Sequence, residues 1–357
     1  MQPFSRKSEQ NYGTDLGKTQ VRRAGRLPVA LAMLTLAATG AVLLPATSAS
    51  AAPGGNAYVA NGSSSSVSVI NKNDEVTGTI KVGNGPLGVA VAKGENRAYV
   101  TNSKDDTVSV IDTLTDKVIT TVPVGDEPFG VAVNPWGDRV YVANKASGTV
   151  SVIDTKTNTV IKDIEVGGYP ESVAVNPSAY EIYVANVASN DVSVIVGGDN
   201  PDWSNTVIAT VPVGNRPNGI AVSPDGQRVY TSNNGSASVS VIDAKGENSK
   251  VVGTMKVDNG YLTGVAVSPD GKHVYSSLSG TTLPERKGNA VALFDTTDMS
   301  KPAKKIEVGN DPAGVGVVGG DLFNVNRSAG TVSVIDMNAE TVRATIPVGA
   351  GPRAVAG

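Results

Sequence analysis

The fold of this chain is decided by the stretch Gly130-Val131-Ala132-Val133-Asn134-Pro135-Trp136-Gly137-Asp138-Arg139-Val140-Tyr141-Val142-Ala143-Asn144 and its continuation to Gly167. Four short apolar runs follow one another here: GVAV, VYVAN, VSVID and TVIKDIEVG. Each is rich in β-branched or aromatic residues and ends at Gly, Pro, Asn or Asp, which is typical of strands joined by tight turns. In the first three runs both faces carry small or apolar side chains, so we predict strands buried between copies of the same unit.

The second run recurs seven times, at residues 57–61, 98–102, 140–144, 182–186, 229–233, 274–278 and 322–326. The aromatic residues of successive copies are 41, 42, 42, 47, 45 and 48 residues apart. A period of roughly 40 to 50 residues with four strands per unit is typical of propeller blades. The repeat therefore predicts one all-β domain rather than two domains.

The two ends of the repeat array complement each other. We name the strands of one unit A, B, C and D in chain order. The first copy begins with a B strand at Tyr58, and the chain ends with an A strand at residues 353–356. We therefore predict a seven-bladed β-propeller over residues 57–357, closed by the C-terminal strand, which completes the first blade and removes an unpaired edge.

The copy Tyr99-Val100-Thr101-Asn102 and its six variants carry a family resemblance. The chain resembles the YVTN family of seven-bladed propellers, which are secreted, periplasmic or cell-surface bacterial proteins, within the lactonase-like propellers. The resemblance covers about residues 56–357 and implies the same fold. It constrains function less, because propellers host binding proteins and several types of enzyme.

The N-terminal region has the pattern of an export signal. Arg22, Arg23 and Arg26 precede an apolar stretch, and small residues with an Ala-x-Ala site follow at Ala49-Ser50-Ala51. This order predicts a secretory signal peptide with an N-terminal extension at residues 1–51, a short linker at 52–56, and a secreted or cell-envelope-associated protein. A retained membrane anchor is the alternative, because about 19 apolar residues just span a bilayer.

Composition narrows the range of partners. The chain has 30 basic and 33 acidic residues, and the leader accounts for six and two of them, which leaves 24 against 31 and a net charge of −7. This balance argues against general nucleic-acid or anionic-membrane binding. There is no cysteine, and the single histidine, His273, is predicted on the face opposite the D–A loops. We expect no metal, no cofactor and no membrane span after cleavage, and we expect a monomer.

The loops from strand D to the next strand A keep Gly and Pro while the residues that flank Pro vary. Such loops converge on one mouth of the central channel in a propeller, and variable tips on a fixed frame are typical of binding sites. The polar tips are Glu171, Arg216, Asn218 and Arg353. Ordinary solvated loop residues are the alternative. The Asn that ends strand B and the Asp that ends strand C are predicted to cap the loops that follow them.

Blade 6 departs from the repeat twice. Its D–A loop, residues 258–263, lacks Pro and is one residue longer, and its B–C loop, residues 278–289, is longer than the others. Both loops belong to the same face, so we predict that Tyr261, Glu285, Arg286 and Lys287 overhang the mouth. The alternative is that these loops differ only because surface loops tolerate changes in sequence and length.

Three classes of function remain after these observations, of which the third is a purely architectural envelope protein. The first is a secreted, non-enzymatic propeller that binds a protein, glycan or small ligand at the mouth. The alternative is a metal-dependent, lactonase-like hydrolase or lyase, with Glu171, Asn218, Asp126, Glu127 and Asp311 in the same ring of loops. No motif of a known hydrolase, protease or nucleotide-binding site is present, so we favour the first.

Overall fold

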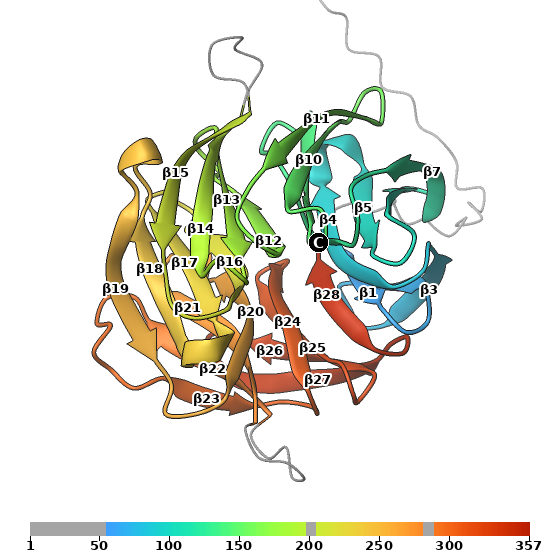
Figure 1. Ribbon diagram of the computed structural model, residues 1–357. Coiled ribbons are helices and arrows are strands. Elements are labelled where there is room, and N and C mark those ends of the chain that lie inside the picture. Colours follow the sequence, from blue (N-terminus) through green and yellow to red (C-terminus); the bar gives the residue numbers. More distant parts are fainter. Residues whose placement is uncertain (1–54, 198–204, 281–288) are drawn as a thin grey trace, which may run out of the picture. The chain divides into compact units, whose positions relative to one another are not determined.

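The structure, a computed structural model, describes residues 55–197, 205–280 and 289–357. These residues form seven four-stranded antiparallel sheets, which are the blades of the propeller (Figure 1). In these ranges the helical segments are three short 3₁₀ turns, η1 (Lys93–Glu95), η2 (Asn234–Ser236) and η3 (Gly246–Asn248). The predicted fold class and blade number are confirmed.

Each blade runs from an inner A strand at the channel to an outer D strand at the rim. Blade 1 contains β28 (Pro352–Ala356), β1 (Ala57–Asn61), β2 (Ser66–Ile70) and β3 (Val76–Lys81). Blades 2 to 4 contain β4 (Pro86–Ala92), β5 (Arg97–Asn102), β6 (Thr107–Asp112) and β7 (Lys117–Pro123); β8 (Pro128–Val133), β9 (Arg139–Asn144), β10 (Thr149–Asp154) and β11 (Thr159–Glu165); and β12 (Pro170–Val175), β13 (Glu181–Asn186), β14 (Asp191–Val196) and β15 (Thr206–Pro212). Blades 5 to 7 contain β16 (Pro217–Val222), β17 (Arg228–Asn233), β18 (Ser238–Asp243) and β19 (Lys250–Lys256); β20 (Tyr261–Val267), β21 (His273–Ser279), β22 (Ala290–Asp295) and β23 (Lys304–Glu307); and β24 (Pro312–Val318), β25 (Asp321–Asn326), β26 (Thr331–Asp336) and β27 (Thr341–Pro347).

The last strand closes the ring. Strand β28 pairs antiparallel with β1, and Val59 lies opposite Val355 in this ladder. Tyr58 lies opposite Ala356. The predicted closure is confirmed, and strand β1 has partners on both of its edges.

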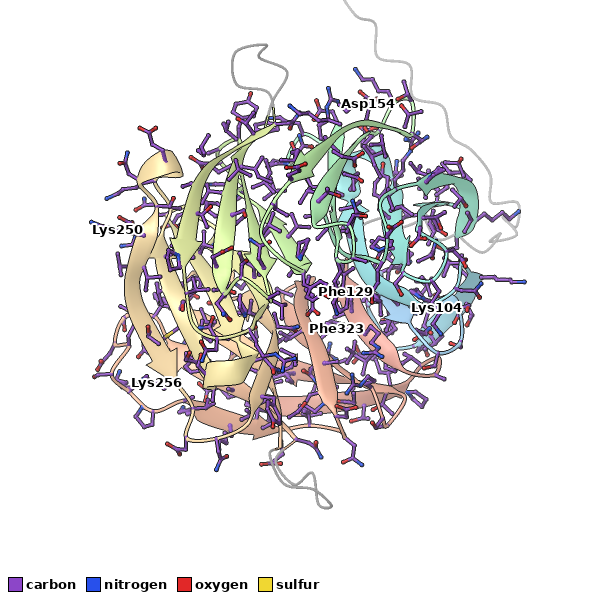
Figure 2. All side chains as sticks on the ribbon, viewed as in Figure 1. Lys104, Phe129, Asp154, Lys250, Lys256 and Phe323 are labelled. Atoms are coloured by element: carbon purple, nitrogen blue, oxygen red, sulfur yellow. The ribbon has the colours of Figure 1, made fainter. Side chains whose placement is uncertain are left out.

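The burial of the strands follows their position in the blade. The B and C strands are buried on both faces, as in β9 and β10, because each blade is covered by its two neighbours. One cluster, for example, joins Tyr99 and Val110 of blade 2 to Val140 and Val142 of blade 3. Figure 2 shows the contrast between Phe129, near the channel, and Lys250, on the outer rim. The core therefore runs between blades rather than inside one of them.

The Asn at the end of strand B does not cap the following loop, so that prediction is wrong. The Nδ2 atom of Asn144 donates to Thr149 Oγ1 at 3.1 Å and to Ser151 Oγ at 2.8 Å, both on the neighbouring C strand. The same bonds recur from Asn61, Asn102, Asn233 and Asn326. The side chain therefore links two strands of one blade instead of closing a turn.

The Asp at the end of strand C does cap the C–D turn in several blades. The Oδ1 atom of Asp154 accepts hydrogen bonds from the backbone N–H groups of Lys156 and Thr157. Asp112, Asp295 and Asp336 accept equivalent bonds. Asp243 instead pairs with the side chains of Arg228 and Lys245. The prediction is confirmed for the former group and wrong for Asp243.

The D–A loop packs directly on the Asn of the next B strand. A Cβ atom at Gly125 would lie 2.7 Å from Asn144 Nδ2, which is too close for a real contact. The same holds for Gly83, Gly167, Gly214, Gly309 and Gly349 against the Asn of their own blades. These positions are glycine because of the space available, and the contact fixes the loop that leads to the channel mouth.

Candidate functional site at the channel mouth

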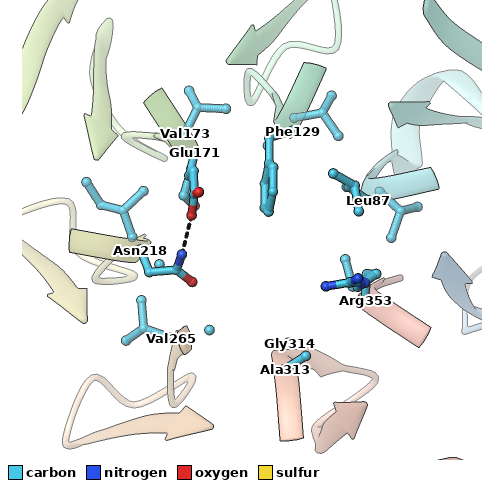
Figure 3. Close-up of a pocket in the computed structure, with 18 of the residues that line it drawn as sticks. Leu87, Phe129, Glu171, Val173, Asn218, Val265, Ala313, Gly314 and Arg353 are labelled. Atoms are coloured by element: carbon cyan, nitrogen blue, oxygen red, sulfur yellow. Dashed lines mark hydrogen bonds between the residues drawn. The ribbon is translucent and has the colours of Figure 1, made fainter. Parts of the chain in front are cut away.

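One residue of each D–A loop occupies an equivalent place at the inner edge of the propeller. In six blades it follows the Pro that begins the A strand, and in blade 6 it follows Leu262. These residues, which we call the mouth ring, are Leu87, Phe129, Glu171, Asn218, Thr263, Ala313 and Arg353. All of them except Thr263 line a cavity of about 210 Å³ at the centre of the ring (Figure 3). The hydroxyl of Thr263 instead donates to the carbonyl oxygen of Ala313 at 2.7 Å.

Below the mouth ring the channel wall is aliphatic. Side chains alternate along a strand, so the residue two positions further along each A strand also faces the channel. We call this set the valine ring: Val89, Val131, Val173, Ile220, Val265, Val315 and Val355. Apart from Ser172, the polar side chains at the cavity belong to the mouth ring, and the space beneath them suits a hydrocarbon group.

Small residues between the two rings let the A strands approach each other. A Cβ atom at Gly88 would lie 2.4 Å from the carbonyl oxygen of Phe129, and one at Gly314 would lie 2.4 Å from that of Arg353. Glycine leaves room for two backbones at this distance, and the small residues Ser172 and Ala354 take the equivalent positions in blades 4 and 1. The close approach keeps the cavity small.

Glu171 is held by groups from two neighbouring blades. Its side chain is buried, with Oε1 at 2.7 Å from Lys145 Nζ, and Asn218 Nδ2 donates to Oε2 (Figure 3). Lys145 comes from the B–C loop of blade 3, and its Nζ lies 5.4 Å from the ring centroid of Phe129. The negative charge of Glu171 is therefore compensated by a lysine that also lies over an aromatic face.

Asp311, on another part of the mouth, is also held by a positively charged side chain. Arg327 Nε and Nη2 donate to its two carboxylate oxygens at 2.6 and 2.7 Å, and the hydroxyl of Ser328 donates to it at 2.7 Å. Such a two-point pair fixes both side chains. Asp311 therefore acts as a clamp for the loops of blade 7.

Arg353 differs from these cations. Figure 3 shows it across the opening from Asn218. Its Nε atom is buried and has no hydrogen-bond partner within the described ranges. Burial lowers the pKa of the Arg353 guanidinium, the charge of Arg327 lowers it further, and Asp311 opposes the effect. Because arginine keeps its proton in proteins, Arg353 is a half-buried positive charge.

The residues predicted from sequence divide into three groups. Glu171, Asn218 and Arg353 line the cavity. Arg216 and Tyr261 are exposed on their loops and do not line it. Glu285, Arg286 and Lys287, together with the leader at residues 1–51, lie outside the described residues.

The residues before and after Pro have different roles, which the sequence does not distinguish. Arg216 and Tyr169 precede Pro and take left-handed φ angles of 54° and 55°, which turn the chain at the rim. Glu171 and Asn218 follow Pro and enter the A strand. Lys145 was missed because its loop gives no signal that it reaches the next blade.

Over residues 55–197, 205–280 and 289–357, no group of three or more His, Cys, Asp and Glu side chains is arranged to hold a metal ion. In the same ranges no helix has the length and apolar character needed to cross a membrane.

Comparison with family models finds a match to the choice-of-anchor I domain over residues 131–254, which is less than half of the 357-residue chain. A search of curated proteins finds no match. The match is compatible with a cell-surface or secreted protein, and it falls within blades 3 to 5 of the propeller.

Solved structures share the fold. A hydrazine synthase from Kuenenia stuttgartiensis matches with a TM-score of 0.68 and 23% identity, over 76% of this chain and 88% of that chain. A protein of unknown function from Desulfotomaculum acetoxidans matches with a TM-score of 0.71 and 16% identity, over 85% and 98%. A putative 6-phosphogluconolactonase from Bacteroides uniformis matches with a TM-score of 0.70 and 19% identity, over 85% and 99%. At these identities the likeness shows the fold alone, a propeller with lactonase-like neighbours.

Proposed function

We propose that this chain is an exported, non-enzymatic propeller that captures a ligand at the mouth of its central channel. The observation that carries the proposal is the contrast between the mouth ring and the rest of the repeat. Elsewhere the blades repeat one another closely, but the mouth ring holds seven side chains of five chemical kinds above a uniform aliphatic wall. Variation confined to one rim of a repeat fold is where binding sites are found.

The size of the cavity favours a small ligand over a glycan or protein. Its volume of about 210 Å³ lies below the roughly 300–1,000 Å³ typical of pockets for drug-sized ligands. A small metabolite, or one group of a larger molecule, fits this space.

The proposal is tested by blocking the cavity. The variant Ala313→Trp places a large side chain in the mouth without removing a charged group. The variant Leu114→Trp is the control, because Leu114 is 59% exposed on a C–D turn of the opposite face. Purified proteins are incubated with a small-molecule extract of culture medium and washed, and the retained compounds are identified by mass spectrometry. We expect a compound retained by the wild type and the control but not by Ala313→Trp. Equal retention by all three contradicts the proposal.

Export is the second part of the proposal. It is supported by the Arg-rich region, the apolar core and the small-residue site before Ala52, and by the choice-of-anchor match. N-terminal sequencing of the protein recovered outside the cell is expected to begin near Ala52. Recovery of the full-length chain from membranes alone would favour an anchor instead.

A further inference from the structure

Two cations at the channel mouth are paired directly with carboxylates. Lys145 is paired with Glu171 at 2.7 Å, and Arg327 is paired with Asp311 at 2.6 Å. Arg353 is left with no ion pair or hydrogen bond in the described part of the chain. Asp311 acts on Arg353 only through a longer-range attraction, so the guanidinium is a half-buried positive charge without a direct partner.

A half-buried positive charge has lost part of its hydration, and an anionic group supplied by a ligand compensates for that loss. The stem of Arg353 passes close to Gly62, where an added Cβ would lie 3.0 Å from Arg353 Cγ. A guanidinium held in one orientation presents a planar pair of donors, which matches two oxygen atoms of one anionic group. The missing partner of Arg353 is thus an anion.

The surroundings of Arg353 distinguish among anions. Its neighbours in the mouth ring are Leu87 and Ala313, which are apolar and offer no side-chain donor. Lys104, Asp105 and Glu127 line a groove that also contains Arg353, and a dianion such as phosphate would be repelled by the two carboxylates there. One charge and two oxygen atoms correspond to a carboxylate.

The cavity also specifies what the carboxylate is attached to. Beneath Arg353 the valine ring presents β-branched aliphatic side chains from all seven blades. The cavity has a volume of about 210 Å³, which is small for a ligand pocket. A short, unbranched hydrocarbon chain fits this space.

We propose that the channel mouth binds the carboxylate of a short aliphatic acid, with Arg353 as its counter-ion and the valine ring around its hydrocarbon chain. This inference rests on the proposed function and names the ligand class of the same cavity. Glu171, Lys145 and Asn218 line the far side and stay bonded to one another.

The test uses isothermal titration calorimetry of the purified protein with defined probes. Sodium acetate, butyrate and hexanoate are expected to bind with rising affinity, about fourfold for each added methylene group that enters the valine ring. Hexanol and hexylamine have the same chain without the negative charge, and hexyl phosphate carries a larger one. Hexanoate is expected to bind at least tenfold tighter than each of the three. Equal or tighter binding of hexylamine or hexanol overturns the proposal, and tighter binding of hexyl phosphate replaces the carboxylate by a phosphate.

Variants assign the effect to Arg353. Arg353→Gln is expected to remove the preference of hexanoate over hexanol, and Arg353→Lys is expected to retain part of it, because the charge stays while the planar fork is lost. Arg216→Gln is the control, an exposed cation on the same rim that does not line the cavity, and it is expected to bind as the wild type does. An unchanged preference in Arg353→Gln overturns the assignment. If Arg353→Gln does not fold, the affinities of the wild-type protein for the different probes decide the test alone.

The failure of this inference differs from that of the proposed function. If Ala313→Trp abolishes retention of a natural compound while hexanoate does not bind the wild type, the cavity is a binding site for another chemical class. If Ala313→Trp changes neither retention nor hexanoate binding, the cavity is not the site and both proposals fail.

Discussion

The contact between Gly125 and Asn144 makes a quantitative prediction about how the loops of the mouth are held. In the variant Gly125→Ala, the new Cβ would lie 2.7 Å from Asn144 Nδ2 and 2.9 Å from Ser147 Oγ. The φ angle of Gly125 is not in the left-handed region, so alanine is disfavoured there by space alone. The Asn144 side chain must move, which breaks its bonds to Thr149 and Ser151.

Two lost hydrogen bonds at about 0.5–1.5 kcal/mol each predict that Gly125→Ala lowers the free energy of unfolding by about 1–3 kcal/mol. Asn144→Ala is expected to cost a similar amount. In the double variant the crowded amide is absent, so the loss should be smaller than the sum by about 1–2 kcal/mol. Ser147 remains close, so relief is incomplete.

The assay is urea unfolding followed by far-ultraviolet circular dichroism for the wild type, both single variants and the double variant. Gly94→Ala serves as the control, because no atom lies within 4 Å of its added Cβ and its φ angle is ordinary; its effect is expected to stay within about 1 kcal/mol. Strictly additive losses for the two substitutions, or a Gly125→Ala variant as stable as Gly94→Ala, would refute the reasoning.

Three further predictions follow from the structure. Deletion of residues 350–357 is expected to lower the midpoint of thermal unfolding, because β1 loses β28 and blade 1 keeps three strands; an unchanged midpoint contradicts the closure. Acid is expected to destabilise the fold, because backbone N–H groups hold the pKa values of Asp112 and Asp336 below the ordinary value. The stabilisation by these two carboxylates is complete above the unfolded pKa of about 3.9 and is lost as the pH falls through the folded pKa. The urea midpoint of the double variant Asp112→Asn/Asp336→Asn should therefore depend less on pH between about pH 5 and 2 than that of the wild type. The same pH dependence in both proteins would disprove the assignment. Dialysis against EDTA is expected to leave the thermal midpoint unchanged, whereas a bound divalent cation with a large loss of stability would support the hydrolase alternative.

The blades and the ring closure could be predicted because they depend on local patterns. Alternating apolar residues, turn residues and a regular period define strands without knowledge of their neighbours. The register of Val59 with Val355 follows from the same repeat, since β28 takes the place that an A strand holds in every other blade. The prediction succeeded for the features that recur in the sequence of every blade.

The mouth could be predicted only in part, because it depends on contacts between blades. The sequence shows that the residues flanking Pro vary, but the left-handed φ angle at Arg216 is a property of the folded loop. Only the residue after Pro, such as Asn218, enters the channel. The reach of Lys145 to Glu171 likewise requires two blades to be packed.

Blade 6 shows that some departures from the repeat are coupled. Leu278 stands where other blades have Asn. Ala290, opposite Leu278, stands where they have Ser, Thr or Asp, and Ala292 stands where they have Ser. All three lie in one hydrophobic cluster. In the D–A loop Asp258 replaces the usual Gly, and a Cβ at Gly260 would meet Leu278 Cδ1. Three polar residues of the other blades are thus replaced together by the apolar Leu278, Ala290 and Ala292, and the Gly of the D–A loop changes with them.

Closure by β28 also sets the order of events during folding. Strand β1 lies near the start of the propeller and its partner β28 lies at its end, so residues about 300 positions apart, such as Val59 and Val355, must meet. Contacts this distant in sequence form late, after most local hairpins. Blade 1 therefore keeps an open edge while the other six blades assemble, and this edge is the point at which an incomplete chain is most exposed to aggregation.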